Sequence, residues 1–313
     1  MKISIIIPVF NSGEYLARCL NSVLGAVKDV DGEILAVDNG SNDNSLEILK
    51  EYGKKYPKLV KVLQCNTPGA GAVRNFAVTK AKGEYIWFVD ADDEITKDSA
   101  KKLIAKADET KADLVMLGLA RVYPDGHRER VAVMDPTDPD YKKKFIMAEN
   151  GPVQVLIRRK WYTEHNFKFL EGVIHEDMDL VPALVLYTDK FESIDETFYL
   201  YYQNSDSVLH KTSWDSHYFD IYMALESLYE RFEKAGVTKE YHDELEWFFI
   251  WNLLVDSAKY YGKFKEGRSG FARSRQMLKK YFPNWRKNKY MNQKKISPKF
   301  KLWLRLSYWG IVI

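Results

Sequence analysis

The chain has 313 residues, 46% of them hydrophobic, which is enough for one large globular domain or two ordinary ones. Its two cysteines, Cys19 and Cys65, argue against a disulfide framework, and no apolar run reaches the roughly 18 residues that would span a bilayer. Thirteen basic and no acidic residues follow Glu266. Residues 1–266 therefore carry 34 basic and 44 acidic side chains, so an acidic body precedes a basic tail although the net charge of the whole chain is +3. This asymmetry indicates an anionic surface as a partner.

Strand and helix patterns alternate over the first 125 residues. The short apolar run at 3–9 lacks the cleavage site of a targeting segment and predicts the first strand. Further predicted strands cover 33–37, 59–64, 84–89 and 114–122, and predicted helices cover about 15–24, 45–55 and 71–81. The alternation predicts an α/β, Rossmann-like fold with a mostly parallel sheet flanked by helices.

The chain is less regular from 126 to 210 and becomes helical from about 214 onward. The middle holds turn-rich segments, the acidic stretch HEDMDL at 175–180 and the aromatic strand pattern FYLYYQ at 198–203. Residues 281–313 interleave Lys and Arg with Trp, Tyr, Phe and Leu. We therefore divide the chain into a first domain at 1–210 and a helical C-terminal extension at 211–313.

Polar side chains follow three of the predicted strands. Asn11 follows the first, Asp38 and Asn39 follow the second, and Asp90 with Asp92 follows the fourth. Ligands of an open parallel sheet bind outside the carboxyl ends of its strands, so we expect these residues to open onto one crevice.

The segment FVDADDEI, residues 88–95, places Asp90, Asp92 and Asp93 within four positions, where like charges disfavour one another. A divalent cation held by one or two carboxylates together with substrate phosphates would relieve this repulsion, and magnesium and manganese bind in this way. Such a cation would also neutralise a departing diphosphate. The alternative is a solvated loop in which Asp92 or Asp93 caps a helix near residue 97.

The segment PGAGAVRN, residues 68–75, is close to the dinucleotide-binding pattern G-x-G-x-x-G. However, Arg74 occupies the third position, where close helix–strand packing requires a small residue, and the segment follows the third strand rather than the first. Both departures argue against a nicotinamide or flavin site. We interpret Arg74 as a cation near a nucleotide base or phosphate, and the alternative is a surface arginine on the first turn of a helix.

The stretch LEGVIHEDMDL, residues 170–180, is a second acidic cluster. Asp177 or Glu176 would serve as a general base if the cluster folds over the crevice. The alternative is capping of the helix that the following residues predict. His175 has no His or Cys partner at ligand spacing, so we do not interpret it as a metal ligand.

In order and spacing these motifs resemble family 2 of the glycosyltransferases, inverting enzymes with the GT-A fold, of the bacterial surface-polysaccharide type. The resemblance covers about residues 1–210 and is carried by ISIIIPVFNSGEYLARCLNSVL, ILAVDNGSNDNS, TPGAGAVRNFAVTKAKGEYIWFVDADD and EGVIHED. It implies a nucleotide-sugar-binding half at 1–125 and an acceptor half at 126–210. It also implies transfer of one sugar from a nucleotide-diphosphate sugar to an acceptor hydroxyl, with Mn²⁺ or Mg²⁺ as the cofactor.

The resemblance implies roles for individual residues. Asp177 would be the catalytic base with Glu176 beside it, and Asp90, Asp92 and Asp93 would form the metal site. The nucleotide-sugar site would be lined by Pro8, Phe10, Asn11, Asp38, Asn39, Arg74, Asn75, Asp90, Ala91 and Asp92. His210 and Lys211 are assigned to the diphosphate, in place of the arginine that usually follows the aromatic strand. Many members carry two aspartates where this chain has Asp38-Asn39, and Asn39 keeps an acceptor oxygen but lacks the charge.

The donor is expected to carry UDP, with dTDP or GDP as alternatives, and the acceptor to be a glycan or a lipid-linked saccharide. Without a Q-x-x-R-W motif or membrane helices, a processive synthase is not expected. The basic aromatic tail is expected to lie on an anionic membrane, which makes the protein cytoplasmic and peripheral on the inner face of the cytoplasmic membrane. The alternatives for the tail are nucleic acid, not expected as a partner, and a helical subdomain packed on the body.

Two other functions remain as alternatives. A nucleotidyltransferase that makes the sugar nucleotide would need a triphosphate loop rich in glycine and lysine, which SIIIPVFNSGEYL does not offer. A non-catalytic module that binds glycan or nucleotide on a decayed transferase fold would be expected to lack the carboxylates, whereas Asp90, Asp92 and Asp177 are all present.

Overall fold

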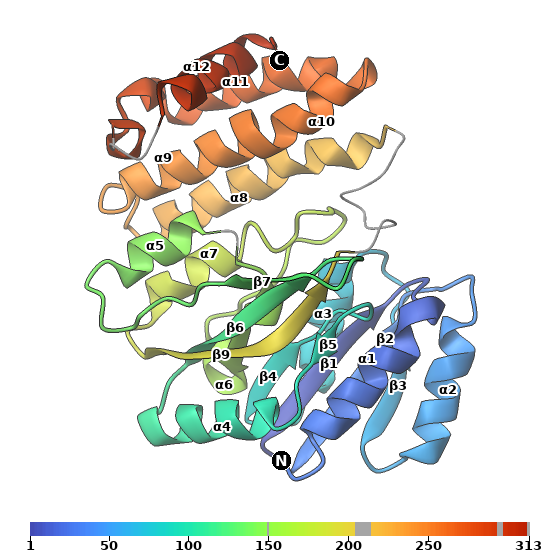
Figure 1. Cartoon of the computed structure of the whole chain (residues 1–313). Helices are drawn as coiled ribbons and strands as arrows, with labels where there is room; N and C mark the ends of the chain where they lie inside the picture. Colours follow the sequence, from blue (N-terminus) through green and yellow to red (C-terminus); the bar gives the residue numbers. More distant parts are fainter. Residues whose placement is uncertain (149, 204–213, 293–296, 312–313) are drawn as a thin grey trace. The chain divides into compact units, whose positions relative to one another are not determined.

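A computed structural model describes residues 1–148, 150–203, 214–292 and 297–311, and the chain divides into two compact units (Figure 1). The first unit comprises 1–141, 150–172 and 188–207, and the second comprises 142–149, 173–187 and 208–313. The second unit therefore takes in the acidic cluster around Asp177 as well as the C-terminal helices. The functional division at residue 210 stays a prediction.

The described part of the first unit is built on one nine-stranded sheet. Its strands are β1 Ile3–Val9, β2 Gly32–Asp38, β3 Val60–Gln64, β4 Tyr85–Phe88, β5 Glu94–Ile95, β6 Leu114–Val122, β7 Arg128–Val131, β8 Val155–Arg158 and β9 Phe191–Tyr202. They follow the order β3-β2-β1-β4-β8-β6-β9-β5, and β7 pairs with β6. The first four strands run parallel to one another, and all five strands predicted from the sequence are confirmed.

The α/β fold class is confirmed, and the sheet is mixed. β8 runs antiparallel to both of its neighbours, β4 and β6, while β5 and β7 are also antiparallel to their partners. β6 therefore does not lie beside β4, because β8 from the irregular middle of the chain is inserted between them. The run VLIR of β8 is short and mostly buried, and such a run carries no signal of strand direction.

Helices cover both faces of this sheet (Figure 1). The helices of the first unit are α1 Gly13–Ala26, α2 Ser45–Lys55, α3 Ala70–Lys80, α4 Ser99–Thr110 and α6 Arg159–Glu164. α1, α2 and α4 lie on one face and α3 lies on the other. α1 buries Leu16, Leu20 and Val23 at helical spacing, and each such side chain contributes about 1.5–3 kcal/mol.

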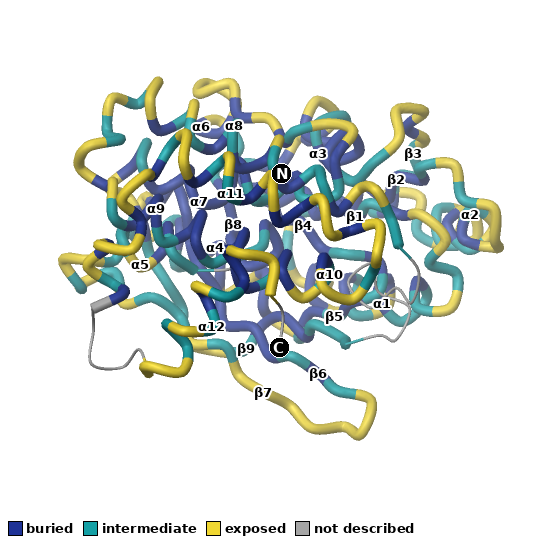
Figure 2. The backbone as a smooth tube through the Cα atoms, turned by 90° about the horizontal axis from the view of Figure 1, so that it is seen from above, coloured by how far each residue is buried: buried dark blue, intermediate teal, exposed yellow. Residues whose placement is uncertain are grey.

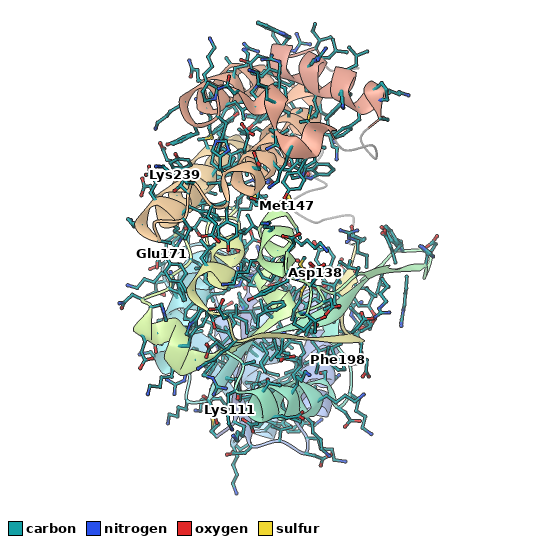
Figure 3. All side chains as sticks on the ribbon, turned by 90° about the vertical axis from the view of Figure 1, so that its left-hand side faces the viewer. Lys111, Asp138, Met147, Glu171, Phe198 and Lys239 are labelled. Carbon is teal, nitrogen blue, oxygen red and sulfur yellow. The ribbon has the colours of Figure 1, made fainter. Side chains whose placement is uncertain are left out.

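Burial follows the layers of the first unit. The central strands are buried, whereas the hairpin of β6 and β7 carries exposed residues along β7 (Figure 2). Phe198 on β9 points toward the side of the sheet covered by α4, where the Lys102 ammonium lies 5.7 Å from the centre of its ring (Figure 3). The strands of the first unit and the helices α1 and α4 therefore enclose one apolar core.

The second unit is helical. Its helices are α7 Val181–Leu184, α8 Asp220–Lys234, α9 His242–Trp251, α10 Ser257–Lys263, α11 Ser269–Tyr281 and α12 Pro298–Trp309, with a π-helical turn at Asn252–Asp256, and α5 Tyr141–Met147 begins at the unit boundary. Phe282, Trp285, Leu304 and Tyr308 of the tail are buried, so the tail is in part a packed subdomain. Within the ranges described, no helix combines the length and the hydropathy needed to cross a bilayer.

Candidate active site

The loops after β1 and β2 lie side by side at the carboxyl edge of the sheet, as predicted. The Asn39 N–H donates to the carbonyl of Val9 at 2.8 Å, and the Asn42 N–H donates to Asn11 Oδ1 at 2.7 Å. Asn11 has a φ of 48°, a left-handed conformation that asparagine tolerates. β4, which carries Asp90 at its end, is the other neighbour of β1, so all three polar loops share one edge.

Residues assigned to the nucleotide differ in exposure at this edge. Phe10 is 58% exposed, an unusual state for a phenylalanine beside a core strand, and Pro8 is half-buried. Asp38 is buried, and its carboxylate accepts hydrogen bonds from the N–H groups of Gly40 and Ser41, both at 3.2 Å. The exposed ring is available to a flat ligand, while Asp38 fixes the loop beside it.

Asn39 holds two loops together through its side-chain amide. Its Nδ2 donates to the carbonyls of Cys65 and Thr67, both at 2.8 Å, and its Oδ1 accepts from the N–H of Gly69 at 2.9 Å. A carboxylate would place negative oxygen against two carbonyls, so this geometry requires an amide. The departure from the family pattern at this position therefore has a structural reason.

Arg74 and Asp90 form an ion pair at the end of β4. Arg74 is buried, 4% exposed, and its Nη2 lies 2.9 Å from Asp90 Oδ1. The guanidinium also lies 5.4 Å from the centre of the Phe169 ring, which packs edge-on against Phe88. The alternative of a surface arginine is wrong, because helix α3 turns this side chain into the interior. A buried cation thus stands beside the first aspartate of the D-x-D motif.

Asn75, the neighbour of Arg74, fastens another segment to α3. Its Oδ1 accepts from the N–H of Phe169 and its Nδ2 donates to the carbonyl of Phe169, both at 2.9 Å. Nδ2 also donates to Glu171 Oε1 at 2.9 Å. Asn75 therefore acts on the chain that leads into the acidic cluster, a role that its spacing in the sequence did not indicate.

Arg18 of α1 supports the second aspartate of the motif. Its Nη2 donates to the carbonyl of Asp92 at 2.6 Å, and its guanidinium lies 3.7 Å from the centre of the Tyr202 ring. Asp92 itself is half-buried, and Ala91 between the two aspartates is buried. Sequence reasoning missed Arg18, because 74 residues separate it from Asp92.

The carboxylates of Asp90 and Asp92 suit a hard divalent cation. Asp90 is 34% exposed, and its Oδ2 makes no hydrogen bond or ion pair with the described residues. Two carboxylates leave coordination positions for phosphate oxygens, the usual arrangement for magnesium and manganese. Among the described residues, three potential ligands cluster within 4.8 Å only at His242, Asp243 and Glu246, where Asn288 and Lys289 already contact the carboxylates.

Glu176 and Asp177 belong to the second unit. Glu176 is buried, and Asp177 is half-buried with its carbonyl accepting from the N–H groups of Leu180 and Val181, which starts the turn into α7. Burial lowers the pKa of His175 to about 4, so it is neutral at physiological pH. Asp179 pairs with Arg231 at 2.8 Å and anchors the cluster on α8. The role of Asp177 as base stays a prediction.

The profile of a known family, described as glycosyl transferase family 2, matches residues 4–165. The chain belongs to this family. The chain is therefore a glycosyltransferase, and the resemblance noted in the sequence is confirmed.

Relatives and solved structures agree with this assignment. The glycosyltransferase is 27% identical to the uncharacterized glycosyltransferase YibD of Escherichia coli over 78% of this chain and 76% of that protein. It is 39% identical to a poly(ribitol-phosphate) beta-glucosyltransferase of Bacillus spizizenii over 54% of this chain but 27% of that longer protein. The structure of S. aureus TarS 1–349 in complex with UDP-GlcNAc matches with a TM-score of 0.75 at 20% identity, covering 99% of this chain and 88% of that one.

A further solved structure is a more distant match. The mannosyltransferase PcManGT of Pyrobaculum calidifontis, in complex with GDP-Man and Mn²⁺, gives a TM-score of 0.54 at 14% identity and covers 99% of this chain and 86% of that one. At these identities the structural matches establish the GT-A-like fold of the glycosyltransferase.

Asp93 of the glycosyltransferase directly precedes β5, and its side chain bonds to strand β9. It is fully buried, its Oδ2 accepts from the Tyr199 hydroxyl at 2.7 Å, and its Oδ1 accepts from the N–H of Tyr202 at 2.8 Å. The Tyr199 hydroxyl in turn accepts from the N–H of Asp90 at 3.1 Å, so Asp93 braces the motif from behind. Burial, reinforced by the charges of Asp92 and Asp90, raises the pKa of Asp93 to about 9.

We expect Asp93 to make the stability of the metal-free protein depend on pH. A carboxyl whose pKa is higher in the folded than in the unfolded chain stabilises the fold at low pH, and this contribution is lost as the pH rises toward about 9. In EDTA, the free energy of unfolding of wild type should therefore fall relative to Asp93→Asn between about pH 4 and pH 9. Denaturant titrations at several pH values measure this, with Asp98→Asn as the exposed control. Parallel curves for wild type and Asp93→Asn would refute a protonated Asp93.

His210 and Lys211, assigned to the diphosphate, lie outside the described residues. Besides Arg18, sequence reasoning missed Tyr199 and Tyr202 as supports of the motif. Both belong to the aromatic strand pattern, which indicated a strand but not its position beside the D-x-D loop.

Proposed function

We propose that the chain is an inverting glycosyltransferase that moves one sugar from a UDP-sugar to a hydroxyl of a growing cell-surface or lipid-linked glycan. The observation that carries the proposal is the buried Arg74 paired with Asp90 at the edge where three polar loops meet. The binding of UDP-GlcNAc by TarS and the poly(ribitol-phosphate) acceptor of the Bacillus relative support the donor and the acceptor class. dTDP- and GDP-sugars remain the other donors to be tried.

In this mechanism Asp177 removes the proton of the acceptor hydroxyl. The oxygen attacks the anomeric carbon from the face opposite the diphosphate, which leaves with the bonding electron pair, so the configuration inverts. Asp90 and Asp92 would hold Mn²⁺ or Mg²⁺, and a bound divalent ion neutralises charge on the leaving diphosphate. Arg74 supplies a fixed positive charge beside Asp90, and preorganised charges of this kind stabilise developing negative charge. We assign Asp93 to support the loop rather than to bind the metal.

A donor panel tests the proposal. Hydrolysis of, and transfer from, UDP-, dTDP- and GDP-sugars would be measured with Mn²⁺, with Mg²⁺ and in EDTA. We expect UDP release with one UDP-sugar, dependent on the divalent ion and stimulated by a polyol or glycan acceptor. Formation of a sugar nucleotide from a nucleoside triphosphate would instead identify a nucleotidyltransferase. Binding of UDP-sugar without any turnover would identify a binding module.

We also propose that α12 contacts the inner face of the cytoplasmic membrane. One side of this helix carries Lys299, Leu302, Arg305 and Trp309, all exposed, with Leu302 at 56% and Trp309 at 65%. Exposed apolar side chains among cations are typical of helices that lie in a lipid interface. The tail thus has a buried face that packs within its unit and an exposed face available to lipid.

The exposed face of α12, rather than the whole tail, is the segment to change. Truncation would remove the buried Trp285 and Tyr308 and so damage the second unit. We expect the double variant Leu302→Ser, Trp309→Ser to lose most of its co-sedimentation with vesicles of phosphatidylglycerol. Phe10→Ser, which changes a residue of similar exposure in the first unit, is the matched control. If the double variant sediments with the vesicles as wild type does, α12 is not the segment that contacts the membrane.

A further inference from the structure

A groove of about 560 Å³ lies between α8 and α11, within the second unit. Its α8 side is lined by Phe219, Asp220, Tyr222, Met223 and Glu226, and its α11 side by Arg273, Gln276, Met277, Lys280 and Tyr281. None of these residues belongs to the site described above. The volume is in the range of about 300–1,000 Å³ typical of small-molecule sites.

The residues that line the groove form one stripe on each helix. On α11, Arg273, Gln276 and Lys280 follow one another at spacings of three and four, which puts them on one face. Such a stripe between two packed helices is ordinarily apolar and closed. Here it stays open and combines aromatic rings and methionines with two cations, an amide and two carboxylates. Glu226 is paired with Lys280, and Asp220 accepts a hydrogen bond from the N–H of Ile174. Arg273 is therefore the cation that remains for a ligand with both carbon-rich and anionic parts.

Hydrogen bonds fix the groove at both ends. At one end the Tyr222 hydroxyl donates to the carbonyl of Gly270 at 2.7 Å. At the other end Glu226 Oε1 accepts from Lys280 Nζ and from the Tyr281 hydroxyl, both at 2.6 Å. A groove held in this way needs little rearrangement to bind a ligand, which lowers the entropic cost of binding.

Two polar side chains of the groove are exposed and keep their hydrogen-bonding groups available to a ligand. Arg273 and Gln276 make no hydrogen bond or ion pair with the described residues. The Arg273 guanidinium lies 4.2 Å from the centre of the Phe219 ring, which supports it at the wall of the groove, and the residue is exposed. A supported guanidinium binds phosphate through two parallel hydrogen bonds.

We propose that this groove binds an anionic polyol- or sugar-phosphate chain, with a phosphate on Arg273 and the carbon skeleton on Phe219, Tyr222 and Met223. The proposal rests on the proposed function, because such a chain is a glycan acceptor held by a part other than its reacting end. Gln276, one turn after Arg273, donates to the hydroxyl groups between phosphates. The groove thereby favours long acceptors over short ones.

The test uses the full chain, with poly(ribitol phosphate) and a single ribitol phosphate as probes, in calorimetry without donor. We expect Arg273→Ala to weaken binding of the polymer by about tenfold, the loss of one charged hydrogen-bonded contact, and Arg273→Lys to recover part of it. Lys279→Ala, on the same helix but outside the groove, is the control and should bind the polymer like wild type. Binding of the single unit should be weak in every variant.

Several results would overturn the inference. The inference is wrong if the wild-type protein does not bind the polymer. It is also wrong if Arg273→Ala and Lys279→Ala lose equal affinity for the polymer. A change of oligomeric state in Arg273→Ala with unaltered polymer binding would make the groove a subunit interface, and loss of vesicle binding alone would make it a lipid contact. Donor turnover is measured separately, so the proposed transfer reaction can fail while polymer binding persists, and the reverse.

Discussion

Replacing Asp177 with asparagine is expected to lower kcat by about 10²–10⁴-fold, the range for loss of a general base, while the KM for the donor stays near that of wild type. An amide cannot take up the hydroxyl proton. It is nearly isosteric with the carboxylate, and the backbone carbonyl that starts the turn into α7 is unchanged. Initial rates with a UDP-sugar and a saturating acceptor measure kcat, and calorimetry with UDP measures donor-site binding.

The control for this variant is Glu240→Gln, an exposed carboxylate of the second unit, which should keep wild-type kinetics. The acidic limb of the pH profile of kcat should disappear in Asp177→Asn, because that limb reports protonation of the base. If kcat of Asp177→Asn stays within about twofold of wild type, Asp177 is not the base. Glu176 is then the next candidate, and Glu176→Gln is the variant to measure.

The second large effect is expected for Asp92→Asn, which should weaken donor binding in Mn²⁺ by about 10- to 100-fold and leave weak binding in EDTA unchanged. The substitution removes one negative charge from a two-carboxylate site, and hard cations depend on such charges. The carbonyl of Asp92, which accepts from Arg18, is retained, so the loop keeps its support. Titration of UDP-sugar with and without Mn²⁺ measures the difference.

Asp98→Asn is the matched control for Asp92→Asn. Asp98 is exposed at the start of α4 and has a φ of 64°, which asparagine adopts as readily as aspartate. Donor binding that is independent of metal in wild type and identical in Asp92→Asn would refute the cation site and would leave Arg74 as the main charge opposite the diphosphate.

The first half of the fold could be predicted because its signals are local. Apolar runs such as Ile3–Val9 and the helical spacing of α1 are visible in single stretches of sequence, and the rule that loops gather at the carboxyl ends of parallel strands then located the polar edge. The insertion of β8 between β4 and β6 was not predictable in this way. Strand order depends on pairings across distant segments, and a buried apolar run fits several of them.

The residues that hold the candidate site in place could not be predicted either, because their contacts also join segments distant in the sequence. The sequence left a surface position open as the alternative for Arg74, because its burial depends on Phe169, far along the chain. Tyr199 likewise supports Asp93 from 106 residues away. Asn39 looked like a loss of charge, whereas the structure shows an amide that bonds two carbonyls. Sequence spacing identifies the residue types that chemistry needs, and long-range packing decides which of them face a ligand.

The hydrogen bonds between Asn75 and Phe169 use the N–H and carbonyl of Phe169, so by themselves they exclude only proline, which lacks the N–H. The need for an aromatic side chain at this position comes instead from Phe88 and from Arg74, which its ring contacts. The main chain of one residue thus sets the registration of this stretch against helix α3, while its side chain covers the guanidinium of Arg74.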